Sequence, residues 1–196
     1  MGRKTSKNGI EVSLVKSNDP DRAEVCEFIR THFNASYNSV VTCFMPQHIV
    51  ARKANGDIIG VIGFRNAADE KLFLEAYLSA SIEDLIDTRF SCSGVARCQI
   101  VEVGNLASIS SRATRLLYQE LLHSLARQEA LWVACTACET LRVSMAKLGL
   151  CFEKVSPASA NSLTPSHGQW GTYFDKTPNV LVGNLRSALT TFAQQN

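Results

Sequence analysis

The sequence has no long hydrophobic run and little net charge. No apolar stretch approaches the roughly 20 residues that span a bilayer, so no integral membrane segment is predicted. Met1 to Lys7 is basic, but polar residues follow it instead of the apolar core of a secretory signal, which predicts a cytoplasmic protein. The formal net charge is only +2, and no basic stripe is interleaved with aromatics, so nucleic acid is not an expected partner.

Disulfide and metal-binding patterns are also missing. The seven cysteines are an odd number, and most of them sit inside apolar stretches, as reduced and buried cysteines do. The four histidines are scattered, and none lies near Cys135 and Cys138. The sequence therefore predicts no metal site. With 196 residues, 45% of them hydrophobic, the chain is long enough to bury one full core.

The stretch from Cys98 to Leu131 changes its hydrophobic period once. Ile100 to Ala107 is mostly apolar and predicts a buried strand, interrupted by Glu102 and Asn105. Short hydroxyl residues follow, and a leucine then recurs at every fourth position, at Leu117, Leu121 and Leu125. This pattern predicts a strand, a polar turn and a helix with one apolar stripe.

A second strand is predicted from Leu131 to Ala137, and a shorter helix from Glu139 to Lys147 that stops before Gly149. A strand, a helix and a strand with short connections form a right-handed parallel crossover, and ligands of such sheets bind beyond the carboxyl ends of the strands. The polar turn from Asn105 to Thr114 is therefore expected at a ligand-facing edge, where free N–H groups of the helix start favour a phosphate.

The flanking regions predict antiparallel strands and further helices. Asn55-Gly56 is a hairpin signal that joins two apolar runs. Ser81 is expected to cap a short helix. The other predicted segments are a first helix at Asp21–Tyr37, strands at Val40–Phe44, Gln47–Lys53, Ile58–Phe64 and Leu150–Lys154, an apolar run at Leu72–Leu78, and an amphipathic helix from Val180 to Gln195.

This order of elements resembles the GCN5-related N-acetyltransferase fold, and several short pieces are similar to the bacterial thermostable hemolysin family. The pieces are Phe44-Met45-Pro46, Gly63-Phe64-Arg65, Leu72 to Leu78, Val101 to Ser108, Trp170-Gly171-x-Tyr173 and Pro178-x-Val180. The resemblance implies an α/β (α+β) fold, a mixed twisted sheet with helices on both faces. Its implied parts are an N-terminal segment (1–18), an acyltransferase-like domain (19–184) and a C-terminal helix (185–196).

Relatives of this fold include the acyl-homoserine lactone synthases, so the resemblance implies an N-acyltransferase with an acyl thioester donor and a small amine or amino acid as acceptor. Acetyltransferases of the fold usually carry glycines in the turn that follows the central strand, whereas Ser108 to Thr114 has none. Close approach of backbone to a pyrophosphate usually needs glycine. No tightly bound cofactor is expected, and phosphopantetheine on an acyl carrier protein is favoured over coenzyme A as the thioester carrier.

Amine acylation needs a base, donors that face the thioester oxygen, and a slot for the acyl chain. Glu102 is the first candidate base, because burial in an apolar strand raises the pKa of a carboxyl; the alternative is a structural ion pair with Arg97 or Arg65. Glu75 is the second candidate, or else a partly exposed residue at a strand edge. Asn105 completes the candidate catalytic set.

Candidate binding residues fall into two groups. The residues expected to hold the phosphate-bearing carrier are Ser108, Ser110, Ser111, Arg112, Arg115 and Thr136, although Ser108 could instead cap the helix and Arg115 could be merely solvated. The residues expected to contact the substrate are Phe44, Arg65, Tyr77, Trp170 and Tyr173; such aromatics could equally belong to the core.

Two other functions stay open. A membrane-active haemolysin would need an exposed amphipathic surface, which only the tail after Val180 offers. A relative of the fold that binds a ligand without catalysis would explain the missing glycines. The enzyme hypothesis predicts instead a cleft that Glu102 and Glu75 face, with an apolar slot nearby.

Overall fold

The computed structural model describes residues 5–7, 9–164 and 167–194. Its strands are β1 (Thr5–Lys7), β2 (Ile10–Lys16), β3 (Gln47–Lys53), β4 (Ile58–Asn66), β5 (Ile100–Ser108), β6 (Trp132–Ala137), β7 (Glu153–Pro157) and β8 (Asn179–Asn184). Its α-helices are α1 (Arg22–Tyr37), α2 (Ile82–Phe90), α3 (Ser111–Arg127), α4 (Glu139–Ala146) and α5 (Leu185–Gln194). Short 3₁₀ helices include η1 (Phe73–Tyr77) and η2 (Arg97–Gln99).

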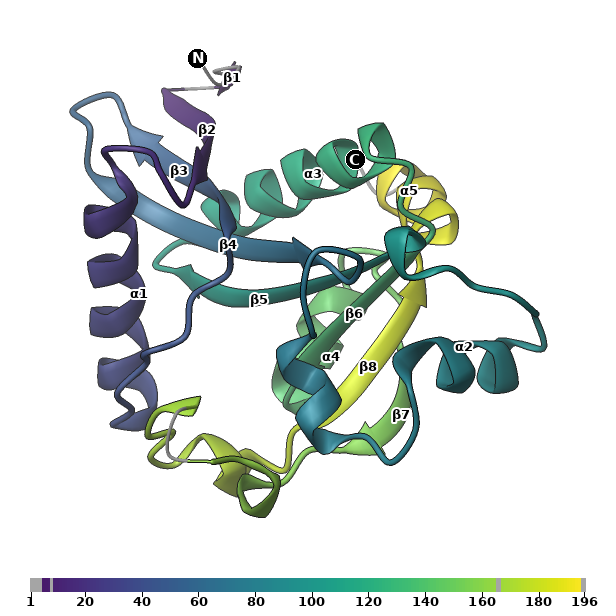
Figure 1. Cartoon of the computed structure of the whole chain (residues 1–196). Coiled ribbons are helices and arrows are strands. Elements are labelled where there is room, and N and C mark those ends of the chain that lie inside the picture. The colour runs from purple at the N-terminus through teal and green to yellow at the C-terminus, as the bar shows by residue number, and fades with distance from the viewer. Residues whose placement is uncertain (1–4, 8, 165–166, 195–196) are drawn as a thin grey trace.

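The strands form one mixed sheet in the order β1-β2-β3-β4-β5-β6-β8-β7 (Figure 1). β1 to β5 pair antiparallel, β5 and β6 pair parallel, and β8 pairs antiparallel with both β6 and β7. The predicted parallel crossover and the hairpin around Asn55-Gly56 are confirmed. The segment before residue 19 supplies β2, which pairs with β3 along its whole length.

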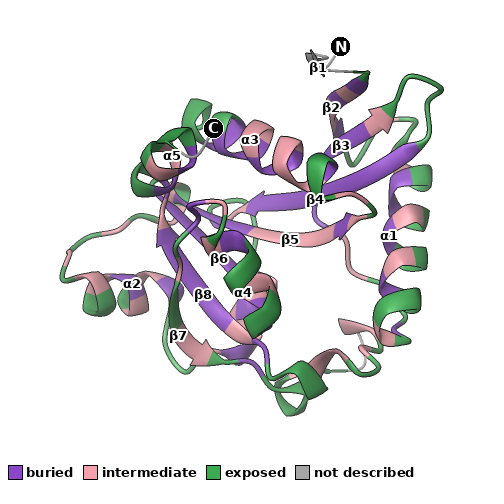
Figure 2. Ribbon diagram, turned by 180° about the vertical axis from the view of Figure 1, so that it is seen from behind, coloured by how far each residue is buried: buried purple, intermediate pink, exposed green. Residues whose placement is uncertain are grey.

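Helices cover both faces of the sheet, and the buried residues divide accordingly. One face packs against α3, α4 and α5, and the predicted stripe Leu117, Leu121 and Leu125 is buried there. The other face packs against α1 over β2, β3 and β4, and against η1 and α2 over β5, β6 and β8. Figures 1 and 2 show the two faces, with the buried strands between the helices.

Three predicted segments are wrong in type or position. Val40–Phe44 is not a strand: only Val40 forms an isolated bridge, to Gln169, which does not extend into a ladder. Leu150–Lys154 is displaced, since β7 begins at Glu153. The helix predicted from Val180 begins at Leu185, and the preceding residues form β8 between β6 and β7. Their β-branched valines suit a strand that is buried on both faces.

The apolar face of α5 packs onto the protein. Leu185, Ala188 and Phe192 are buried in the same cluster as α3, so the surface on which the haemolysin hypothesis depended is used for folding. Among the described residues, no helix combines the length and the hydropathy that crossing a membrane requires.

The two halves of the sheet separate at the middle of β5. β5 and β6 pair only from Ile100 to Val103, whereas β5 continues to Ser108 beside β4 alone. Between the pairs Ala107–Val61 and Gly104–Gly63, Asn105 and Leu106 oppose the single residue Ile62, which is a β-bulge. Figure 1 shows β5 and β6 side by side at one end and apart at the other.

Candidate active site

A cavity of about 140 Å³ opens where β5 and β6 diverge. Its lining comes from two sides of the sheet. One side is apolar and belongs to α3 and α4: Tyr118, Leu121, Leu122, Leu125, Leu141 and Met145. The other side is aromatic and polar: Arg65, Phe73, Tyr77, Glu102, Trp170 and Tyr173. The cavity thus joins an apolar compartment to charged groups.

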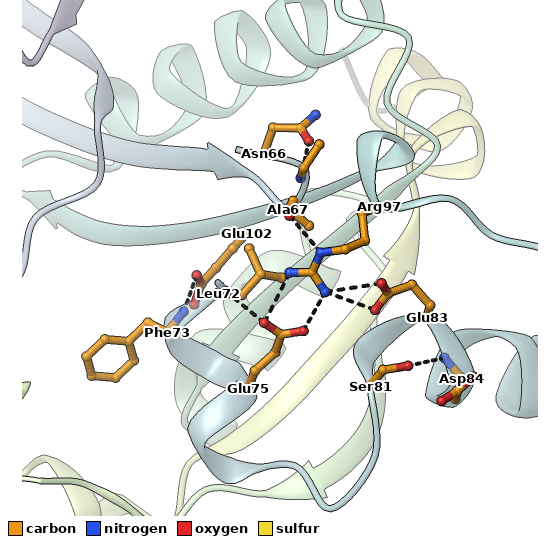
Figure 3. Close-up of polar contacts among 11 residues, drawn as sticks. Asn66, Ala67, Leu72, Phe73, Glu75, Ser81, Glu83, Asp84, Arg97 and Glu102 are labelled. Carbon is orange, nitrogen blue, oxygen red and sulfur yellow. Dashed lines mark hydrogen bonds and ion pairs between the residues drawn. The ribbon is translucent and has the colours of Figure 1, made fainter. Parts of the chain in front are cut away.

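Glu102 supplies the buried carboxylate of this cavity. Its residue is 3% exposed, and its oxygens accept hydrogen bonds from the backbone N–H groups of Phe73 (2.8 Å) and Leu74 (2.9 Å) of η1, as Figure 3 shows for Phe73. Nε of Arg65 lies 3.3 Å from Oε2. Burial raises the pKa of Glu102 to about 7, although Arg65 and the two N–H groups oppose the rise. A base that titrates near neutrality suits proton transfer.

Glu75 has a different environment, although it belongs to η1, the helical turn that binds Glu102. It accepts the N–H of Leu72 (2.9 Å) and pairs with Arg97 through two contacts, of 2.8 and 3.2 Å (Figure 3). Burial alone would raise the pKa of Glu75, but the hydrogen bonds from Arg97 and Leu72 outweigh it and hold the pKa below its usual value. Glu75 is not among the residues that line the cavity.

Arg97 connects three segments of the chain around η1. Besides Glu75, its guanidinium pairs with Glu83 of α2 (3.1 Å), and its Nε donates to the carbonyl of Ala67 (2.7 Å). Figure 3 shows that these contacts join η1, α2 and the chain after β4. The run Leu72–Leu78 therefore forms a fixed helical turn rather than a strand edge, and its N–H groups point at Glu102.

Met45 lies between Arg65, which contacts Glu102, and Asn105 in the bulge. Its Sδ accepts from Nε of Arg65 (3.0 Å), and its backbone N–H donates to Oδ1 of Asn105 (2.8 Å). The side chain needs two glycines beneath it: a Cβ on Gly63 or Gly104 would lie 2.7 or 2.6 Å from Met45. Close approach explains why β4 and β5 carry glycine here.

Asn105 occupies the bulge and lines the cavity. Its φ is +50°, in the left-handed region that asparagine tolerates better than most residues. His48 of β3 lies behind it, fully buried, with Nε2 3.4 Å from Oδ1 of Asn105 and Nδ1 2.5 Å from Nη1 of Arg22. Burial, together with the charge of Arg22, lowers the pKa of His48 to about 3, so its imidazole is neutral.

Aromatic rings form the wall of the cavity that is opposite the apolar compartment. Trp170 lies 5.5 Å from Tyr173 and 5.6 Å from Phe73, measured between ring centroids. The hydroxyl of Tyr173 donates to the carbonyl of Thr136 (3.1 Å). Of the predicted substrate residues, Arg65, Tyr77, Trp170 and Tyr173 line the cavity. Phe44 does not, and Arg30 covers its ring at 4.8 Å.

Of the predicted carrier-binding residues, Thr136 of β6 lines the cavity, whereas the residues of the turn and of the start of α3 do not. Ser110, not Ser108, caps α3: its Oγ accepts the N–H of Ala113 (3.4 Å). The hydroxyl of Ser108 instead donates to the carbonyls of Ser110 (3.0 Å) and Ile59 (3.4 Å). Ser111 and Arg112 are exposed on the first turn of α3, and Arg115 follows on the next.

Thr136 enters the cavity from β6, and its Oγ1 is a buried atom without a hydrogen-bond partner in the described chain. Within the same part of the chain, no group of three or more histidine, cysteine, aspartate or glutamate side chains could hold a metal ion. Cys135 and Cys138 have the Cys-x-x-Cys spacing, and both are buried free thiols.

Sequence reasoning missed His48, Met45 and Phe73 as members of the site. His48 has the only imidazole that is fully buried among the described residues. A histidine inside the apolar run of β3 is the one signal that could have drawn attention to it. Phe73 contributes its N–H group, which no sequence pattern reveals.

The family model described as thermostable hemolysin matches residues 15–189. A search of the curated proteins finds no match.

Several solved structures have folds similar to that of this chain. FeeM, an N-acyl amino acid synthase from uncultured soil microbes, has a TM-score of 0.65 at 11% identity, over 100% of this chain and 98% of its own. The acyl-homoserine lactone synthase LasI has a TM-score of 0.61 at 11% identity, over 94% and 95%. A GCN5-related N-acetyltransferase from Kribbella flavida has a TM-score of 0.51 at 14% identity, over 88% and 97%. The expected fold is confirmed.

Proposed function

The chain belongs to the thermostable hemolysin family, and from its cavity we propose that it is an N-acyltransferase, which moves an acyl chain from a thioester to a small amine or amino acid. One observation carries the proposal: a buried carboxylate, whose pKa burial raises to about 7, faces a cavity with an apolar compartment. The fold that it shares with FeeM and LasI supports the same reaction class.

In the proposed reaction, Glu102 first accepts a proton from the ammonium group of the acceptor. The free amine then attacks the thioester carbon, so that a C–N bond forms while negative charge develops on the carbonyl oxygen. When the carbonyl re-forms, the C–S bond breaks and its electron pair leaves on sulfur, which takes up the proton that the newly bonded nitrogen loses to become an amide. Oε1 of Glu102 accepts the N–H of Leu74 and keeps a second lone pair that can take the proton, whereas Oε2 meets both the N–H of Phe73 and Nε of Arg65.

The apolar compartment between the sheet and α3 is the proposed acyl site. Leu121, Leu122 and Leu125 bring aliphatic side chains to the cavity from one face of α3, and Met145 does so from α4. Moving an acyl chain from water into this lining stabilises the bound state by about 0.8 kcal/mol for each buried methylene group. An acyl chain longer than acetyl is therefore the proposed cargo.

An acyl carrier protein is the proposed donor. The turn from Ser108 to Thr114 has no glycine with which to approach a pyrophosphate, and Arg112 lies on the exposed first turn of α3, where a single phosphate or an acidic partner could meet it. We expect an acylated carrier to be consumed faster than the matching coenzyme A thioester. The variant Arg112→Glu should weaken carrier binding and reduce its dependence on salt. Equal rates with the two donors would contradict this choice of donor.

The function itself is tested by thiol release. The purified protein is incubated with a long-chain acyl carrier protein, or with the matching coenzyme A thioester, and with pools of amino acids and other small amines. We expect thiol release that requires an amine, and an amide product identified by mass. Donor turnover that is independent of every amine, or no turnover with either donor, would contradict N-acyl transfer. If the Glu102→Gln variant lyses red cells as well as the parent does, lysis does not depend on this site.

A further inference from the structure

Three polar side chains from distant parts of the sequence form a line behind the bulge of β5. Arg22 begins α1, His48 belongs to β3, and Asn105 is the bulged residue. A guanidinium group can only donate hydrogen bonds, so the contact of 2.5 Å from Nη1 of Arg22 makes Nδ1 of His48 the acceptor. The single proton of the neutral imidazole is then on Nε2, which faces Oδ1 of Asn105.

This tautomer fixes the orientation of the Asn105 amide. Its Oδ1 faces two donors, the N–H of Met45 at 2.8 Å and Nε2–H of His48 at 3.4 Å. A flipped amide would point its NH₂ group at both donors. Nδ2 therefore lies on the opposite side of the amide, away from His48.

The amide nitrogen is available to a ligand. Nδ2 of Asn105 has no hydrogen-bond partner among the described residues. In the described chain, the buried side-chain nitrogen and oxygen atoms without a partner are Oγ of Ser39 and Oγ1 of Thr136, and Nδ2 of Asn105 is not one of them. An atom that has no partner and is not in this set reaches solvent. Nδ2 is therefore not sealed inside the protein, and Asn105 lines the cavity.

Asn105 also lies on the same face of the sheet as the proposed base. Arg65 contacts Glu102, the Sδ of Met45 contacts Arg65, and the N–H of Met45 binds Asn105. The bulge, with its φ of +50° at Asn105, turns this side chain to the face at the point where β5 leaves β6. A strained residue held by a network of neighbours is often part of a functional site.

We propose that Nδ2 of Asn105 donates a hydrogen bond to the thioester carbonyl oxygen, and that His48 and Arg22 are positioning residues that fix this amide. The inference rests on the proposed acyl transfer. As the amine attacks, the electron pair of the C=O bond moves to oxygen, and Nδ2–H stabilises that charge without transferring its proton. A donor held in place before the reaction needs no reorganisation when the charge develops.

The variant Asn105→Asp tests the donor. Aspartate keeps the oxygen that accepts from Met45 and His48 and tolerates positive φ, but ionised it has no N–H to donate. Binding is measured by calorimetry with two acyl-pantetheine analogues: a ketone, in which CH₂ replaces the thioester sulfur, and its counterpart without the carbonyl. We expect the parent to bind the ketone about tenfold more tightly than the counterpart. The variant should lose this preference while still binding the counterpart.

The outcomes separate the two proposals. If the parent binds neither analogue, the proposed acyl-binding site is contradicted, and so is the proposed role of Asn105. If the parent prefers the ketone and Asn105→Asp keeps that preference, only the donor assignment is overturned. In the acyl-transfer assay, Asn105→Asp should lower kcat by about 100-fold, as the loss of one such donor does in other enzymes.

The positioning role is tested at His48 with a pair of variants. His48→Leu fills similar space but offers nothing to Asn105, whereas His48→Gln can donate to Oδ1 of Asn105 and accept from Arg22. We expect His48→Leu to reduce kcat and the ketone preference together, and His48→Gln to restore part of both. If both variants keep the parent's ketone preference and kcat, His48 has no positioning role. Equal losses in both variants, with no rescue by glutamine, would also overturn it.

Discussion

Glu102 and Glu75 both accept hydrogen bonds from the helical turn η1, yet their surroundings give them opposite properties. Glu102 is 3% exposed and meets one arginine contact at 3.3 Å, while Glu75 pairs through two contacts with Arg97. Burial raises the pKa of Glu102, whereas at Glu75 burial is outweighed by the hydrogen bonds from Arg97 and Leu72, which lower the pKa. Each glutamate has one arginine beside it, so the deeper burial of Glu102 and the closer, two-contact pairing of Glu75 with Arg97 decide which carboxylate can serve as a base.

The strongest test of this comparison is the loss of the base. Glu102→Gln should lower the rate of acyl transfer by about 100-fold or more, because a general base contributes roughly that factor. Both Glu102 oxygens accept backbone N–H groups, so the glutamine NH₂ must face one of them and the free energy of unfolding should also fall. Thermal unfolding is therefore measured beside the rate.

Glu75→Gln is the matched control for that loss. It removes a carboxylate from η1, the helical turn whose N–H groups bind Glu102, at a residue that does not line the cavity. We expect lower stability but a rate within about threefold of the parent, since no step of general-base catalysis is removed. A larger loss of rate at Glu75 than at Glu102 would transfer the role of base to Glu75.

Removing Arg97, the cation that pairs with Glu75, should lower the free energy of unfolding. Arg97→Met leaves Glu75 and Glu83 without their shared partner, and the free energy of unfolding should fall by about 2 kcal/mol, less than for a fully buried pair because Arg97 partly reaches solvent. Urea unfolding measures the change. Arg142→Met, which breaks the surface pair with Glu139, is the control and should change little. Equal effects at the two sites would show that Arg97 is an ordinary surface ion pair.

The pH dependence of the rate should also distinguish the two glutamates. If Glu102 must be ionised to accept the proton, kcat should fall about tenfold for each pH unit below its pKa, which burial raises to about 7. The profile is measured with saturating donor and amine. The same limb should persist in Glu75→Gln and vanish in Glu102→Gln. A limb that survives in Glu102→Gln would belong to another group.

Stability should depend on pH with opposite signs at the two glutamates. The raised pKa of Glu102 means that the folded protein holds a proton that the unfolded chain releases, so its contribution is full below about pH 4.3 and is lost as the pH rises to about 7. The lowered pKa of Glu75 gives a contribution that is present above about pH 4.3 and is lost as the pH falls further.

Unfolding curves of the parent, Glu102→Gln and Glu75→Gln between about pH 3 and 8 measure both contributions, each at most roughly 1.4 kcal/mol per pH unit. Glu102→Gln should remove the decline toward neutral pH, and Glu75→Gln should remove part of the loss in acid. The same sign of pH dependence at both residues would contradict the comparison.

Local sequence patterns predicted most of the framework but little of the geometry of the site. The change of period between Cys98 and Leu131 gave β5, α3 and their parallel neighbour β6, because hydrophobic periodicity is a property of neighbouring residues. The same reasoning failed at Val180–Asn184, where Leu181 and Leu185 have helical spacing by coincidence across a strand and a helix.

Local periodicity is sufficient to place Glu102 in a buried strand, before a polar turn and a leucine-striped helix. Long-range packing is needed to turn the N–H groups of η1 toward Glu102, to pair Arg97 with Glu75, and to place His48 behind Asn105. These contacts join residues 22 to 57 positions apart. Sequence periodicity reports which face of an element is buried, whereas the partners of a buried polar group depend on how distant elements pack and on where a bulge shifts their register.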